Sequence, residues 1–191
     1  MELEAAKMIG AGLAAIALAG AGVGIGIIFG NYLSGAMRNP SAAQKQFPNL
    51  LLGFALAEAT GLFGLVVALI ILFAFYVQFH GDFGPGGGFQ AGVIFAAGII
   101  LYTIIFGIKK AQKDFPETIF NYMVSLGVLI FTVTGLISLS KGFNFLDYDA
   151  LAHYPKHGQH IGIIAIELGV FVTVIGSMVS IFYAFVARGK K

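Results

Sequence analysis

Five long apolar runs separated by short polar stretches restrict the fold of this 191-residue chain more than any other feature. They cover about residues 8–35, 50–79, 90–108, 118–139 and 160–187. Each is long enough for a helix to cross a hydrocarbon core of roughly 30 Å. Hydrophobic residues make up 58% of the chain and charged residues only 10%, and a soluble fold of this size lacks the interior to bury them. The chain is therefore predicted to be an integral membrane protein.

The expected fold class is all-α. Only helices and closed barrels satisfy every backbone group inside lipid, and the apolar runs show none of the alternation that barrel strands require. We expect a helical hairpin followed by a three-helix transmembrane domain, five spans in total. The chain has no cysteine, which excludes disulfides and thiolate metal sites. We expect no cofactor, no metal site, no nucleic-acid partner and no catalytic residue.

The cations predict the orientation of the chain in the membrane. Eight of them flank the spans on one side: Arg38, Lys45, Lys109, Lys110, Lys113, Arg188, Lys190 and Lys191. Three lie on the other side: Lys7, Lys141 and Lys156. The richer side is expected to face the cytoplasm. The chain is thus predicted to cross a bacterial inner membrane with its N-terminus outside and its C-terminus in the cytoplasm.

Glycines form two stripes on the first predicted span. Gly20 and Gly24 lie on one face at about 100° per residue, and Gly22 and Gly26 lie on another, about 200° away. Small residues in a membrane helix allow close approach of a neighbour. Two such faces predict a neighbour on each side, as in a ring of identical helices. A generic glycine-rich membrane helix is the simpler alternative.

Glu58 lies in the middle of the second predicted span, nine residues after Asn49. This places it roughly 13 Å into the membrane at about 1.5 Å per residue. An ionised carboxylate at that depth is costly, so we expect Glu58 to be protonated in lipid and to ionise when a polar partner arrives. Such a carboxyl can load and release a proton. The alternative is a carboxyl held by a local hydrogen bond for packing.

Residues 1–75 resemble the proteolipid, or c-type subunit, that forms the c-ring of F-type ATP synthases. The resemblance rests on the glycine stripes, on Arg38-Asn39-Pro40 in the polar turn and on Ala57-Glu58-Ala59 in the second helix. It implies that Glu58 is the proton-binding carboxylate of a homo-oligomeric rotor ring. It also implies that Arg38, Asn39 and Pro40 face the central-stalk subunits, and that the ring works against the ATP synthase a-type stator protein within the lipid bilayer.

The ion expected at Glu58 is the proton. Sodium-type proteolipids carry Gln near the position of Ile25 and a hydroxyl residue directly after the glutamate. Here Ile25 is apolar, Ala59 follows Glu58, and Thr60 comes one place later.

The second half of the chain holds another pair of titratable residues. His160 and Glu167 are seven residues apart, which places them on one face of a helix. Glu167 is expected about 10 Å inside the outer membrane surface. A titratable histidine above a buried acid suggests a path for protons or cations. A structural ion pair remains the alternative.

A glycine-rich outer loop, His80 to Gln90, precedes the third span and predicts tight turns. Residues from about 71 to 191 resemble the MnhB/MrpB-type subunit of multisubunit Na⁺/H⁺ antiporters. Pro-Gly-Gly-Gly-Phe-Gln in the loop and His-Gly-Gln-His-Ile-Gly before Ile-Glu-Leu-Gly-Val carry the resemblance. It implies a membrane subunit that works with other antiporter subunits. The N-terminal segment usual for that family is replaced here by the second span of the hairpin.

Two domains are therefore expected: the hairpin of residues 1–75 and an antiporter-type domain of residues 76–191, whose first span comes from about 65–79. The function favoured by the sequence is that of a non-catalytic, proton-translocating rotor subunit of ATP synthase. The alternative is a membrane subunit of a multisubunit Na⁺/H⁺ antiporter. Three extra helices tethered to each rotor hairpin would crowd the ring surface that must pass the stator, which argues against a turning ring of the whole chain.

Overall fold

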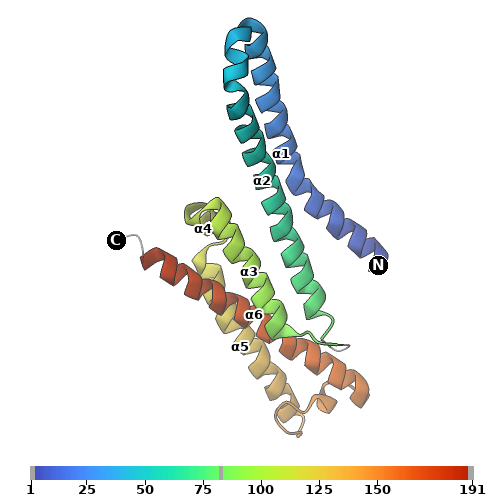
Figure 1. Ribbon diagram of the computed structural model, residues 1–191. Helices are drawn as coiled ribbons and strands as arrows, with labels where there is room; N and C mark the ends of the chain where they lie inside the picture. Colours follow the sequence, from blue (N-terminus) through green and yellow to red (C-terminus); the bar gives the residue numbers. More distant parts are fainter. Residues whose placement is uncertain (1–2, 82–83, 189–191) are drawn as a thin grey trace. The chain divides into compact units, whose positions relative to one another are not determined.

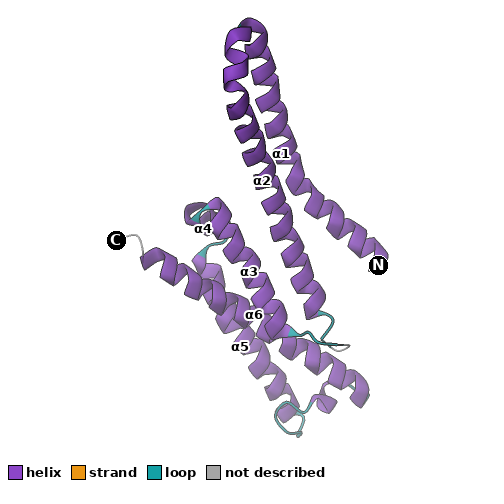
Figure 2. Cartoon of the chain, in the orientation of Figure 1, coloured by secondary structure: helices purple, strands orange, loops and turns teal. Residues whose placement is uncertain are grey.

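A computed structural model describes residues 3–81 and 84–188. Its elements are α1 (Leu3–Arg38), α2 (Pro40–Gln78), α3 (Gly88–Phe106), α4 (Ile108–Asp114), α5 (Glu117–Ser140), the 3₁₀ helix η1 (Tyr148–Leu151) and α6 (Pro155–Arg188) (Figure 1). Helix dominates and no strand occurs in the described ranges (Figure 2). The all-α prediction is confirmed.

The helices long and apolar enough to cross a membrane are the five that the sequence predicts. Within the described residues they are Leu18–Arg38, Pro40–Gln78, Gly88–Phe106, Glu117–Ser140 and Pro155–Arg188. The length and hydropathy of these helices support the prediction of five spans.

The polar stretch from Arg38 to Asn49 is mostly helical, whereas the sequence predicts a connecting segment there. Asn39 is the one residue between α1 and α2. Its Oδ1 accepts a hydrogen bond from the backbone N–H of Ala42 at 3.3 Å, and this caps the new helix. Pro40 occupies the first position of α2, where a missing N–H costs nothing. The helix thus continues beyond the apolar segment.

The polar stretch from Lys109 to Glu117 also contains helix that hydropathy does not reveal. Gly107 adopts φ 82°, which ends α3, and α4 begins at the next residue. Glycine takes this left-handed conformation without the steric cost of a Cβ.

The chain divides into two compact units, residues 1–69 and 70–191, so that α2 contributes to both. In the first unit, edge-to-face packing brings the ring centroids of Phe29 and Phe54 to 5.9 Å. The Tyr32 hydroxyl donates to the Ala43 carbonyl at 2.9 Å. These contacts hold α1 against α2 near the turn.

The second unit is built around α6, which packs against α3 and α5 (Figure 1). Its core includes the fully buried Val179 and the nearly inaccessible Ile99, Ile175 and Tyr183. At the crossing of α5 and α6, a Cβ at Gly127 would collide with Thr173 and with the carbonyl of Gly169. The absent side chain is what allows the two backbones to approach.

Candidate functional sites

Glu58 lies on an exposed surface of α2 within the predicted span. Large apolar side chains that are also exposed, Leu56 and Leu62, are its neighbours along the helix. The nearby Thr60 hydroxyl donates to its own helix, to the Leu56 carbonyl at 2.5 Å. That hydroxyl is thus engaged by backbone, an arrangement that leaves the carboxyl as the chemically distinctive group of this surface.

The glycine stripes of α1 are open in the single hairpin. A Cβ at Gly20, Gly22, Gly24 or Gly26 would meet no atom within 4 Å. The face of α1 toward α2 is different: Ala21 and Leu18 face Gly61, and Ile28 faces Gly53. At 100° per residue this face lies between the two stripes, so each stripe is available to a further neighbour.

Arg38, Asn39 and Pro40 form the turn of the hairpin, with Arg38 ending α1 and Pro40 beginning α2. All three are exposed. The Asn39 side chain also accepts a hydrogen bond from the Ser41 hydroxyl at 2.7 Å. The turn is therefore a short, hydrogen-bonded tip.

The Glu167 carboxylate lies against the glycine-rich loop of the second unit. A Cβ at Gly81 would stand 2.6 Å from one carboxylate oxygen and 2.8 Å from the other. A Cβ at Gly87 would stand 2.9 Å from the first oxygen, and Gly87 adopts φ 113°. Gly88 abuts the backbone of Glu167. The sequence predicts the tight turns but not this contact, which joins residues about eighty positions apart.

His160 and Glu167 both lie on α6, as predicted. His160 is exposed, whereas Glu167 is partly buried. The role of the two as a path stays a prediction.

Gln78, the last residue of α2, is a buried polar residue that the sequence did not single out. Its side chain is only 4% exposed, and its amide oxygen has no hydrogen-bond donor among the described residues. The position of Gln78 at the end of an apolar run, just before the glycine loop, is the signal that could have indicated it.

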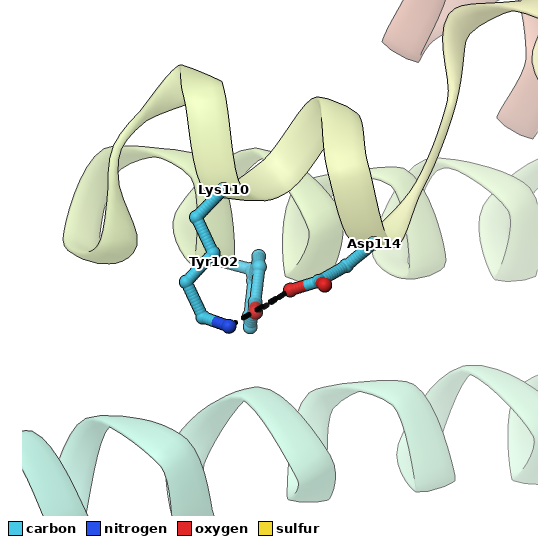
Figure 3. Close-up of polar contacts among 3 residues, drawn as sticks. All are labelled: Tyr102, Lys110 and Asp114. Atoms are coloured by element: carbon cyan, nitrogen blue, oxygen red, sulfur yellow. Dashed lines mark hydrogen bonds and ion pairs between the residues drawn. The ribbon is translucent and has the colours of Figure 1, made fainter.

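Tyr102, Lys110 and Asp114 form a second cluster that the sequence did not single out (Figure 3). The Tyr102 hydroxyl donates to Asp114 at 2.5 Å, and the Lys110 ammonium lies 3.2 Å from the same carboxylate oxygen. The Tyr102 hydroxyl, followed by Lys110, lowers the pKa of Asp114. Asp114 in turn raises the pKa of Lys110. The spacing of Lys110 and Asp114 indicates a helical ion pair, but the tyrosine belongs to α3.

Comparisons with known proteins match both parts of the chain. Residues 60–180 match the family described as "Domain related to MnhB subunit of Na+/H+ antiporter", and residues 9–71 match the family of the C-type subunit of ATP synthase. The antiporter subunit mnhB2 of Staphylococcus haemolyticus is 34% identical over 123 residues, which are 63% of this chain and 86% of the relative. The protein of the same name from Staphylococcus aureus strain Newman is 34% identical over 120 residues, 61% of this chain and 84% of the relative.

Both resemblances inferred from the motifs are thus confirmed. A hairpin of the ATP synthase proteolipid type precedes a domain that accounts for most of the length of the staphylococcal relatives. The chain belongs to the family of MnhB-related subunits of Na⁺/H⁺ antiporters.

Proposed function

We propose that the intact chain is a non-catalytic membrane subunit of a multisubunit Na⁺/H⁺ antiporter. The observation that carries the proposal is the enclosed carboxylate of Glu167, inside a packed helical unit that corresponds to most of the staphylococcal antiporter subunits. A partly buried acid within a membrane span is costly unless it serves transport or pairing. The partners are the other subunits of the antiporter and the bilayer, with the N-terminus outside and the C-terminus in the cytoplasm.

The connectivity of the chain favours this function over the rotor function that the sequence favours first. Each copy carries three further candidate spans after the hairpin. In a rotor ring those helices would follow every second hairpin helix and crowd the surface that passes the stator. In an antiporter, a hairpin added before the antiporter-type domain has no rotating surface to obstruct.

Affinity purification from native membranes tests the proposal. A tag at the C-terminus of the full-length chain should recover antiporter subunits and no rotor or stalk subunits of ATP synthase. Recovery of the intact chain in a turning, ATP-synthesising ring would contradict both the proposal and the steric reasoning behind it.

The hairpin of residues 1–75 supports a second candidate function, that of a proton-carrying rotor subunit. The specific observation is the exposed Glu58 on α2, together with two open glycine faces on α1 that flank the α2 contact. A ring of hairpins would fill both faces, and Arg38, Asn39 and Pro40 would meet the central stalk.

A hydrophobic carbodiimide tests the second candidate. It should modify Glu58 selectively and faster at lower pH, because the protonated acid is the reactive form. Glu58→Gln is the control and should remain unmodified. Strong protection by Na⁺ at neutral pH would show that Glu58 binds sodium instead of protons.

A further inference from the structure

Electron-rich groups of the second unit gather where α2 ends. The Val77 carbonyl accepts hydrogen bonds from the backbone N–H groups of His80 at 3.3 Å and of Gly87 at 3.2 Å. The loop therefore folds back onto the last turn of α2. The last carbonyls of a helix carry the negative end of its dipole, so this point attracts positive charge.

The loop brings a carboxylate to the same point. Gly87, which donates to the Val77 carbonyl, is also one of the glycines that Glu167 approaches, and Gly81 is the other. A side chain at either position would occupy the space beside the carboxylate oxygens. The glycines thus keep the carboxylate and the end of α2 accessible to each other.

Gln78 adds an amide oxygen from the adjoining position. It lies one residue after Val77 and three before Gly81, which places it about one helical turn from the glycine that faces Glu167. A buried amide oxygen without a donor is unfavourable by about 1–3 kcal/mol. A cation is the partner that an oxygen, a carboxylate and a helix C-terminus can share.

We propose that Gln78, Glu167 and the backbone carbonyls at the end of α2 form a binding site for Na⁺. Small hard cations take oxygen ligands from carboxylates, amides and carbonyls. Helix C-terminal ends and unwound carbonyls are used in this way in membrane transporters. One carboxylate among the named ligands matches one positive charge, so the site suits a monovalent ion. Its place in transport rests on the antiporter proposal, whereas the binding itself is a property of the chain.

The test measures equilibrium binding of ²²Na⁺ to the full-length chain in lipid nanodiscs, with choline chloride to keep the ionic strength constant. The wild-type chain should bind one Na⁺ saturably. Gln78→Met preserves the length of the side chain but removes the oxygen, and Glu167→Gln removes the charge. Each should weaken binding by about tenfold or more, the effect of losing about 1.4 kcal/mol. Gln112→Met, on α4, is the matched control and should bind as the wild type does.

Stability measurements keep the result interpretable. Na⁺ should raise the thermal unfolding temperature of the wild type more than choline does, because an ion that binds only the folded state stabilises it. Should Gln78→Met fail to fold, Gly81→Ala provides a second variant, since its methyl group displaces the carboxylate. It too should lose the Na⁺-dependent shift.

Two results would overturn the inference: absence of saturable Na⁺ binding by folded wild-type chain, or unchanged binding by folded Gln78→Met. The second would mean that a water or packing alone accommodates the amide. The outcome is separate from that of the antiporter proposal. A chain that binds Na⁺ but does not join antiporter subunits keeps the site and loses the function. A chain that joins them and supports exchange without binding Na⁺ keeps the function and loses the site.

Discussion

The hydroxyl of Tyr102, in α3, donates a hydrogen bond of 2.5 Å to the carboxylate of Asp114, at the end of α4. This bond and the Lys110 ion pair lie at the end of the second unit that is predicted to face the cytoplasm. They fix a short helix that has few buried residues of its own.

Tyr102→Phe should raise the pKa of Asp114 toward its ordinary value, because the hydroxyl is the largest cause of the lowering. A carboxyl with a lowered folded pKa contributes stability above its unfolded pKa and loses it as the pH falls through the folded value. The variant should therefore lose this contribution at a higher pH than the wild type. A ¹³C NMR titration of the Asp114 carboxyl measures the shift. Tyr122→Phe, an exposed tyrosine of α5, is the control; an equal shift there would contradict the assignment.

Bulky residues in either glycine stripe should prevent ring assembly of residues 1–75 expressed alone. Gly22→Leu and Gly24→Leu each fill a face that is empty in the single hairpin, and a close neighbour in lipid tolerates no such side chain. Insertion into the membrane should be unaffected. Native gel electrophoresis after mild detergent extraction reports the ring.

Val23 provides the control for this experiment. It is 65% exposed and lies on the side of α1 away from the residues that contact α2. Val23→Phe should allow assembly. If rings form with leucine at position 22 or 24, that face has no close neighbour and the ring inference is wrong.

Gly127→Ala should destabilise the second unit by about 1–3 kcal/mol, the usual cost of excess volume in a packed core. The added methyl group meets Thr173 and the Gly169 backbone, neither of which can move away without separating α5 from α6. Thermal unfolding in detergent measures the effect. Gly35→Ala, where a Cβ meets nothing within 4 Å, should not destabilise the chain; equal losses from both variants would exclude the close crossing as the cause.

Glu167→Gln should reduce Na⁺-dependent proton exchange when the chain is expressed with the other antiporter subunits. Glu167→Leu should reduce it at least as much if charge is what transport requires. The exchange is measured by dye-reported acidification in everted vesicles. Normal exchange by both variants, at equal levels of assembled complex, would leave Glu167 with a structural role only.

The spans could be predicted from the sequence because hydropathy and length report directly on the lipid environment. The helical extension after Asn39 could not, since Ala42, Ala43 and Gln46 are good helix formers that are too polar for a lipid signal. Hydropathy marks where a helix meets lipid and not where it ends.

The candidate sites divide in the same way. The depth of Glu58 and Glu167 follows from counting along a helix, and so it could be predicted. The approach of Gly81 to Glu167 depends on tertiary packing between distant segments, and the partner of Tyr102 depends on the bend at Gly107. No local pattern encodes either contact.

The one-residue turn at Asn39 has a consequence for any soluble protein that binds the tip of the hairpin. Because Arg38 ends one helix and Pro40 begins the next, the backbone there is ordered before a partner arrives. Ordering a flexible polar loop costs about 1–2 kcal/mol of conformational entropy per residue. That cost is met during folding, so association through the tip retains more of its contact energy as affinity.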